Sequence, residues 1–238
     1  MNYKSFDILI VCNGYSQRLS ACLYFWEKMN YPKNKYRIVV STWIKDHETL
    51  KVLSKHVEKD ILNIAIATNE DSDFHNKGKM IKNSFNLINR QINEFVLMSD
   101  ADIIFHSETL NEINSLILSS EKEKIISSLR EDILENELDI FFKNYRHTKN
   151  TDWAWKNLSF QINSPSPFMG WFLSFPSKYL SKINFIESHK GYDTIDWKIY
   201  GQLLSMNLKK EIIFFEFMPL HIPHGKKGAN WMGVNIEQ

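Results

Sequence analysis

The chain has 238 residues, of which 43% are hydrophobic and 13% aromatic, and its formal net charge at pH 7 is +1. This apolar content suits a sizeable core, and the near-zero charge argues against nucleic acid as a partner, because no global field attracts a polyanion. Cys12 and Cys22 are too few for a disulfide framework and are expected as buried apolar residues. The opening residues do not resemble a signal peptide, and the longest apolar stretch, residues 168–175, is far shorter than the roughly 20 residues of a membrane helix. We therefore expect a cytoplasmic protein without a transmembrane segment, with peripheral membrane association left open.

Strand and helix patterns alternate through the first half of the chain. Such alternation indicates parallel βαβ units, and hence an α/β fold with a mostly parallel sheet. Ser16 is expected to cap the first helix, with Leu19, Leu23 and Trp26 turned inward. The expected strands are 6–11, 36–41, 61–67 and 95–98, and the expected helices run from Ser16 to before Pro32, over 48–56 and over 78–88.

The second half of the chain is less regular. Residues 131–167 combine charged, irregular and loop-like sequence, and no regular element is expected there. Neither repeats nor low-complexity tracts occur, so one globular unit is expected. The expected helices are 108–119 and 194–206, and the expected strands are 125–129, 169–175 and 212–217.

Two carboxylates, Asp100 and Asp102, follow the apolar run Phe95–Met98, which reads as a buried strand. Ligands of open α/β sheets bind at the carboxyl ends of strands. Two Asp oxygens there could hold a hard divalent cation, which in turn could hold a diphosphate. The spacing alone is weak support, because 12 Asp in 238 residues give about 0.6 Asp-x-Asp matches by chance. A second match at residues 71–73 lies in a polar loop, and we interpret it as a solvated turn.

Four stretches, in this order, resemble the inverting glycosyltransferases of the GT-A fold, especially the large family 2 group. Residues 8–19 are similar to the family's opening strand and turn, and residues 97–102 to its metal-binding Asp-x-Asp strand. Residues 77–83 resemble the start of a Gly-x-x-x-x-Arg-Asn helix, with Lys82 in place of Arg and Asn83 kept. Residues 195–203 resemble a Glu-Asp-Trp helix that ends in Arg-Leu. The departures are Ile195 for the Glu, Gln202 for the Arg, and Ser41-Thr42-Trp43 where acidic residues often follow the second strand.

The resemblance implies a Rossmann-like, mostly parallel central sheet flanked by helices, in a single GT-A domain over residues 1–238. Residues 1 to about 105 would bind the nucleotide-sugar, and residues from about 106 to 238 would bind the acceptor and supply a C-terminal lid. The implied activity is metal-dependent transfer of a sugar from a nucleotide-sugar, with a UDP-sugar expected, to a saccharide or glycan acceptor, with inversion. The implied cofactor is Mn²⁺ or Mg²⁺. The oligomeric state is left open.

The resemblance also assigns candidate site residues, each of which has an ordinary structural reading as well. Asp102 would hold the metal, Asp100 would face the ribose or a metal-bound water, and His221 and His224 are candidate late ligands, although two nearby histidines are more often surface residues. Two registers compete for the catalytic base: Asp196 matches the family's Asp-Trp better than Asp193, and both could instead stabilise a helix start. The remaining candidates are Asn13, Tyr15, Arg18, Lys82 and Ala101 for the donor, and Trp153, Trp155 and Trp171 for the acceptor.

Two other functions remain open. A phosphatase of the haloacid dehalogenase type also has a strand followed by Asp-x-Asp, but its motif normally opens the chain. A sugar-binding subunit with an inactive site would explain the loss of Glu at Ile195. A nucleotidylyltransferase shares the GT-A core, yet residues 13–19 lack its glycine-rich loop.

Overall fold

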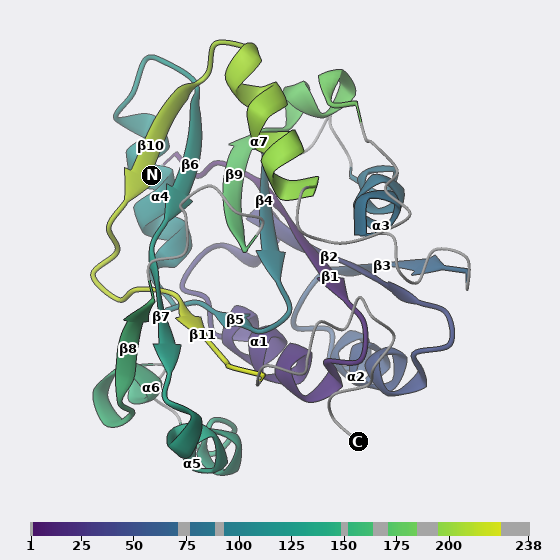
Figure 1. Ribbon diagram of the computed structural model, residues 1–238, viewed down its shortest axis with the longest axis vertical. Coiled ribbons are helices and arrows are strands. Elements are labelled where there is room, and N and C mark those ends of the chain that lie inside the picture. The colour runs from purple at the N-terminus through teal and green to yellow at the C-terminus, as the bar shows by residue number, and fades with distance from the viewer. Residues whose placement is uncertain are drawn as a thin grey trace.

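A seven-stranded sheet runs through the middle of the protein, in the order β10-β6-β9-β4-β1-β2-β3 (Figure 1). The computed structural model describes residues 2–70, 77–88, 93–148, 152–163, 171–184 and 195–224. Neighbouring strands are parallel except where β9 pairs with β4 and β6. The strands are β1 (Phe6–Cys12), β2 (Tyr36–Trp43), β3 (Ile64–Asn69), β4 (Phe95–Asp100), β6 (Lys124–Ser128), β9 (Phe172–Pro176) and β10 (Lys209–Ile213).

The central strands are apolar on both faces because each face is covered by helices. Along β1, Ile8 and Ile10 enter one core while Leu9 and Val11 enter the other, as the alternation of side chains in a strand requires. Helices α1 (Ser16–Glu27), α2 (His47–Glu58) and α4 (Thr109–Leu118) supply the first core. Helices α3 (Lys77–Phe85) and α7 (Ile195–Ser205) supply the second. The result is a three-layer α/β/α arrangement.

A second, four-stranded sheet in the order β5-β11-β7-β8 lies beside α1 (Figure 1). Its apolar side packs on Phe25 of α1 and on Phe141, which are stacked with centroids 6.4 Å apart. The strands are β5 (Ile103–Ile104), β7 (Arg130–Ile133), β8 (Phe160–Asn163) and β11 (Leu220–His221), and the helices beside them are α5 (Leu138–Asn144) and α6 (Trp153–Asn157).

The structure confirms the predicted fold class and corrects several elements. Ser16 is the first residue of α1 rather than its cap: the cap position is Tyr15, and no side chain caps this end. Residues 131–167, expected to be irregular, contain β8, α5, α6 and most of β7. The strand expected at 212–217 is replaced by β10, which ends at Ile213, and by the short β11. Cys12 and Cys22 are buried in the first core, as predicted.

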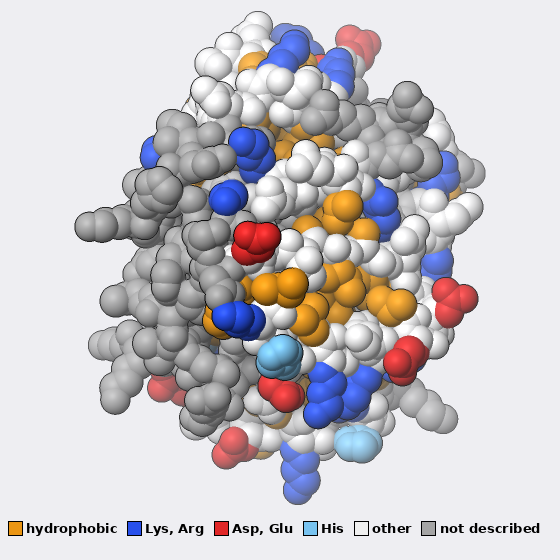
Figure 2. Space-filling view, turned by 90° about the vertical axis from the view of Figure 1, so that its right-hand side faces the viewer, with side chains coloured by type: hydrophobic (Ala, Val, Ile, Leu, Met, Phe, Trp, Pro, Cys, Tyr) orange, Lys and Arg blue, Asp and Glu red, His pale blue; other side chains and the backbone are white. Residues whose placement is uncertain are grey.

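Strand β3 is the last strand of the main sheet, on the side of the molecule that Figure 2 faces. Apolar side chains gather near the middle of this face, with charged side chains around them (Figure 2). None of the helices in the described part of the chain has both the length and the apolar character needed to cross a membrane.

Candidate active site

The acidic pair lies at the carboxyl edge of the main sheet, where β1 and β4 end side by side. Asp100 is the last residue of β4 and pairs in register with Val11. Asp102 follows in the turn that leads into β5. Strand β11 runs antiparallel to β5, with His221 opposite Ile103, and the Ile222 backbone N–H donates to the Asp102 carbonyl over 2.8 Å. This backbone pairing brings a late segment of the chain to the acidic motif.

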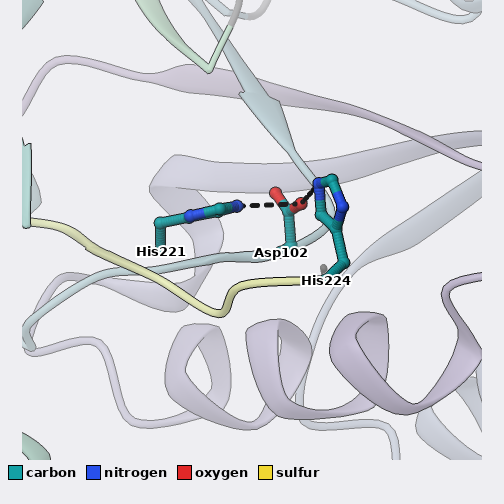
Figure 3. Close-up of side chains that lie close together, drawn as sticks. All are labelled: Asp102, His221 and His224. Atoms are coloured by element: carbon teal, nitrogen blue, oxygen red, sulfur yellow. Dashed lines mark ion pairs between the residues drawn. The ribbon is translucent and has the colours of Figure 1, made fainter. Parts of the chain in front are cut away.

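Asp102, His221 and His224 form a compact cluster of metal-ligating side chains (Figure 3). Asp102 Oδ2 lies 3.4 Å from His221 Nε2 and 3.5 Å from His224 Nε2. The candidate ligand atoms all lie within 4.8 Å of one another. Metal–ligand bonds of about 2.0–2.2 Å place neighbouring ligand atoms roughly 3–3.4 Å apart. The donor set and its spacing therefore fit one divalent cation with positions left for other ligands.

The two histidines differ in how they are held. His221 is 9% exposed, and its Nδ1 lies 3.1 Å from Asp132 Oδ1. Burial lowers the pKa of His221, but Asp102 and Asp132 outweigh it and the pKa is raised. Burial likewise raises the pKa of Asp102, and the two imidazoles hold it below its usual value. His224 is 29% exposed at its side chain, and its Nδ1 is buried with no hydrogen-bond partner among the described residues.

A buried lysine joins Asp100 to the candidate base. Lys77 Nζ lies 3.4 Å from Asp100 Oδ1 and 3.1 Å from Asp196 Oδ2. Burial lowers the pKa of Lys77, yet the two carboxylates outweigh it and raise the pKa above its ordinary value. Asp196 is 7% exposed, and its Oδ1 is buried without a hydrogen-bond partner in the described part of the chain. One carboxylate oxygen is thus held by the lysine, and the other is left for a donor that the described residues do not supply.

The acidic motif, Lys77 and His224 line a small pocket of about 100 Å³, which Val11 and Tyr15 complete. Ligand pockets commonly measure about 300–1,000 Å³, so this space suits a metal ion and a phosphate group rather than a whole nucleotide-sugar. Tyr15 is buried, with its ring centroid 5.3 Å from that of His224. The lining of the pocket therefore combines two carboxylates, the buried ammonium group of Lys77 and an aromatic ring.

The other donor candidates on the first strand and helix hold parts of the fold together. Arg18 donates from Nε to the Ile222 carbonyl over 3.3 Å and from Nη2 to the Pro223 carbonyl over 2.6 Å. It thereby anchors the segment between the two histidines. Asn13 is buried; its Oδ1 accepts from the Trp43 backbone N–H over 3.0 Å. Lys82 is exposed on α3 and does not line the pocket, although Lys77 on the same helix does.

The three candidate acceptor tryptophans separate in space. Trp171 directly precedes β9, whose Phe172 pairs with Ser99 of β4, and it is 3% exposed, with Arg130 over its ring. It is buried beside the acidic edge. Trp155 donates from Nε1 to the Met218 carbonyl over 2.7 Å, and Trp153 packs on the same core beneath the smaller sheet. Neither lines the pocket. Asp193, the turn at 71–73 and the lid expected within 225–238 lie outside the described residues.

Two residues of this site carry no role in the sequence prediction. Lys77 directly precedes the glycine of the helix motif. The donor-binding role was assigned to Lys82 instead, because Lys82 matches the family's Arg. Asp132 lies in the run Arg130-Glu131-Asp132-Ile133, which reads as a charged segment. Its burial depends on β7 pairing with β11, and nothing local in the sequence indicates that pairing.

No protein-family model and no curated protein sequence matches the chain. Among solved structures, S. aureus TarS 1–349 in complex with UDP-GlcNAc is similar, with a TM-score of 0.67, 15% identity, and coverage of 97% of this chain and 61% of that one. The mannosyltransferase PcManGT from Pyrobaculum calidifontis, in complex with GDP-Man and Mn²⁺, has a TM-score of 0.64, 13% identity, and coverage of 97% and 60%. A 4-diphosphocytidyl-2C-methyl-D-erythritol synthase from Anaerococcus prevotii has a TM-score of 0.53, 15% identity, and coverage of 98% of both chains.

The chain spans about 60% of the length of these TarS and mannosyltransferase chains. At identities of 13–15%, the likeness concerns the arrangement of the backbone. The order of strands, with the antiparallel β9 inserted next to β4, and the helices on both faces agree with it. The chain has the GT-A fold shared by glycosyltransferases of this type.

Proposed function

We propose that this protein is a metal-dependent glycosyltransferase that transfers a sugar from a nucleotide-sugar to a hydroxyl of a saccharide or glycan acceptor, with inversion. The observation that carries the proposal is the cluster of Asp102, His221 and His224 at the carboxyl edge of β4. Beside it, Lys77 connects Asp100 with Asp196. The structural neighbours that were solved with UDP-GlcNAc or with GDP-Man and Mn²⁺ support a nucleotide-sugar as the donor.

Asp102, His221 and His224 would hold the metal ion. A bound divalent cation acts as a Lewis acid and neutralises charge on the leaving diphosphate. Imidazole nitrogen favours transition metals, whereas Mg²⁺ prefers an all-oxygen environment. Two imidazoles and one carboxylate therefore favour Mn²⁺ over Mg²⁺, which narrows the prediction made from the sequence.

Asp196 would be the catalytic base. Its Oδ1 is the buried oxygen that has no partner among the described residues, and an acceptor hydroxyl could donate to it. Lys77 on Oδ2 fixes the orientation of the carboxylate. Inversion requires such a base on the side of the sugar opposite the leaving group, within about 2.6–3.2 Å of the attacking hydroxyl. The proton moves from that hydroxyl to Asp196, and the sugar's bond to the diphosphate breaks as the new glycosidic bond forms.

The donor would approach from the carboxyl ends of β1 and β4. Asp100 lines the pocket, with a side chain that is 33% exposed, and would meet the ribose or a metal-bound water. Tyr15 also lines the pocket and would contact the base of the donor. Residues 1 to about 105 would thus bind the nucleotide, and a UDP-sugar is the donor we expect.

The alternatives fare differently against this geometry. The GT-A fold leaves a haloacid dehalogenase phosphatase without support. Nucleotidyl transfer is kept as an outcome of the test because the synthase from A. prevotii matches 98% of both chains, although residues 13–19 lack a glycine-rich loop. The proposal of an active enzyme over an inactive sugar-binding subunit is supported by Asp196, whose Oδ1 has no hydrogen-bond partner among the described residues. Ile195 and Gln202 are departures outside the pocket lining: Ile195 is buried in the core, and Gln202 bonds the backbone of Asn184.

The test is a panel of UDP- and GDP-sugars, each incubated with the protein and Mn²⁺ and followed by release of the nucleoside diphosphate. Release that EDTA and Asp102→Asn abolish is the expected result, and the anomeric configuration of the product sugar, read by NMR, reports inversion. A parallel reaction with CTP and sugar phosphates detects pyrophosphate. Pyrophosphate release without diphosphate release would assign the site to nucleotidyl transfer. Tight binding of a nucleotide-sugar without turnover on any acceptor would assign it to a binding subunit.

A further inference from the structure

We propose that Asp132 is a positioning residue for the metal centre: it fixes the ring orientation and the tautomer of His221, so that Nε2 is presented to the cation. The inference rests on the proposed metal site. Asp132 lies on β7 and His221 on β11, and the two residues are direct neighbours in the parallel pairing of these strands. Neighbouring residues of a parallel pair project from the same face of the sheet. The pairing therefore brings a carboxylate to the back of an imidazole whose front faces Asp102.

The hydrogen bond at the back of the ring decides which nitrogen is available at the front. A carboxylate only accepts hydrogen bonds, so the contact of 3.1 Å between Asp132 Oδ1 and His221 Nδ1 requires the proton on Nδ1. In the neutral ring the lone pair is then on Nε2, which lies 3.4 Å from Asp102 Oδ2. The other tautomer would place the Nδ1 lone pair against the acceptor Asp132 Oδ1. Without a metal ion a proton on Nε2 also faces Asp102, so a metal ion that binds there takes the place of that proton. Metal-binding histidines commonly have such a carboxylate partner, which sets the ring and increases its basicity as a ligand.

Asp132 is itself held by neighbouring groups. It is 6% exposed, and Arg130 Nε lies 3.3 Å from the same Oδ1. The Arg130 guanidinium in turn lies over the ring of Trp171, 5.5 Å from its centroid. A line of contacts thus runs from Trp171, beside β4, through Arg130 and Asp132 to His221. Trp171 is therefore buried at the end of this line of contacts and is not an exposed platform.

His224 has no comparable support among the described residues, because its Nδ1 is without a hydrogen-bond partner there. This difference predicts that His221 and His224 depend on different neighbours for their contribution to metal affinity. Carboxylates contact both ring nitrogens of His221, whereas His224 is held through Nε2 and by the ring of Tyr15. Loss of the support at Asp132 should therefore cost metal affinity through His221 alone.

The chain supplies a matched control. Asp152 Oδ1 lies 2.7 Å from His106 Nε2, an Asp–His pair of the same kind at which the described residues show no metal-ligating cluster. His106 stacks on Phe217, with centroids 4.0 Å apart, under the smaller sheet. If an Asp–His pair matters only for the fold, Asp132→Asn and Asp152→Asn should have the same consequences.

The experiment measures binding of Mn²⁺ alone by isothermal titration calorimetry, at about pH 8, above the ordinary pKa of histidine. Asp132→Asn should weaken Mn²⁺ binding about 10- to 100-fold, as is usual for such a partner, while Asp152→Asn leaves it unchanged. In a His221→Gln background, Asp132→Asn should cost nothing further, because the two residues act as one unit. Wild-type Mn²⁺ affinity in folded Asp132→Asn protein would overturn the inference.

A second measurement needs no variant. In the wild type loaded with Zn²⁺, a diamagnetic substitute for Mn²⁺, the ¹⁵N shifts of His221 should show the proton on Nδ1 and the metal on Nε2. Metal on Nδ1, or a proton kept on Nε2, would overturn the inference even if Asp132→Asn fails to fold. The same data separate this inference from the proposed function. Mn²⁺ binding that depends on Asp132, in a protein that transfers no sugar, would sustain the inference and sink the glycosyltransferase proposal.

Discussion

Lys77 and Asp196 form a buried ion pair, 3.1 Å from Nζ to Oδ2, between the first turns of two helices that lie 119 residues apart in the sequence. The same ammonium reaches Asp100 at 3.4 Å. A single cation therefore joins the end of the strand that carries the acidic motif to the helix that carries the candidate base. The contacts of Lys77 couple the positions of α3, β4 and α7, and so connect the proposed donor side of the site to the proposed acceptor side.

Replacing Lys77 should destabilise the protein as well as the site. Lys77→Met removes the partner of a buried carboxylate, a change that typically costs about 3–5 kcal/mol of unfolding free energy. Urea denaturation measures the loss. Lys82→Met, on the exposed side of the same helix, is the matched control and should change the unfolding free energy by less than about 0.5 kcal/mol. Equal effects of the two variants would mean that the pair contributes no stability.

Asp196→Asn should slow turnover without weakening donor binding. It keeps the shape of the side chain and removes the base, so kcat should fall by about 10²- to 10⁴-fold. The affinity for the donor with Mn²⁺ should stay within a few-fold of wild type, and titration of both variants separates the two quantities. Asp139→Asn, at an exposed position of α5, is the control. Loss of activity in Asp193→Asn with normal turnover in Asp196→Asn would transfer the role to the other register.

Arg18→Met should weaken the metal centre although Arg18 is not a ligand. The change removes both hydrogen bonds to the Ile222 and Pro223 carbonyls, which fix the segment between the two histidines. A positioning loss of about 1 kcal/mol corresponds to a roughly fivefold weaker Mn²⁺ affinity. Arg146→Met, which loses a 2.7 Å bond to Ser20 Oγ, is the control and should leave Mn²⁺ affinity intact. A drop in nucleotide affinity without metal would instead favour the direct donor role predicted from the sequence.

Glu27 should make stability depend on pH. Burial raises its pKa, but the hydrogen bonds from His56 at 2.6 Å and Lys59 at 3.1 Å outweigh burial and lower the pKa below its ordinary value. A depressed pKa in the folded state stabilises the protein above the unfolded-state pKa, and this stability is lost as pH falls through the folded-state pKa. Glu27→Gln should therefore cost about 1–3 kcal/mol near neutral pH and progressively less in acid.

The control for that experiment is Glu94→Gln. Glu94 pairs with Lys4 at 2.7 Å, but both side chains are partly exposed, at 45% and 26%. Pairs of this kind contribute about 0–1 kcal/mol. Glu94→Gln should therefore change the unfolding free energy by about 0–1 kcal/mol. For Glu27→Gln, the unfolding free energy should converge with that of the wild type at low pH. A constant difference at every pH would show that Glu27 acts by packing and not by charge.

The main sheet was predictable because its strands are apolar on both faces and alternate with helices of clear period. Runs such as Ile8-Leu9-Ile10-Val11 indicate a buried strand without any knowledge of their neighbours. The smaller sheet was not predictable for the opposite reason. Strands β5 and β11 have two residues each, and β7 begins Arg-Glu-Asp, so their structure depends on pairing between distant segments. No window of sequence contains both partners.

The residues of the candidate site also separate into those that local sequence indicates and those that depend on distant contacts. Asp100 and Asp102 could be predicted because the strand that carries them is local, and the late histidines because the family resemblance suggests them. The structure brings Asp102, His221 and His224 together, and their roles stay predictions until metal binding is measured. Lys77 and Asp132 were missed because their importance comes from what they face, across 119 and 89 residues of intervening chain.

Every strand of the main sheet ends before residue 214, whereas both candidate imidazoles come after residue 220. The two candidate histidine ligands therefore lie in a later part of the chain than the main sheet, whereas Asp102 directly follows a strand of that sheet. A circular-dichroism spectrum dominated by the large sheet could look native while β11 is detached and the candidate metal cluster has lost two of its three side chains. Substitutions in β11 could thus disrupt the candidate metal cluster and leave the main sheet folded, so metal binding and folding have to be measured separately in every variant of this segment.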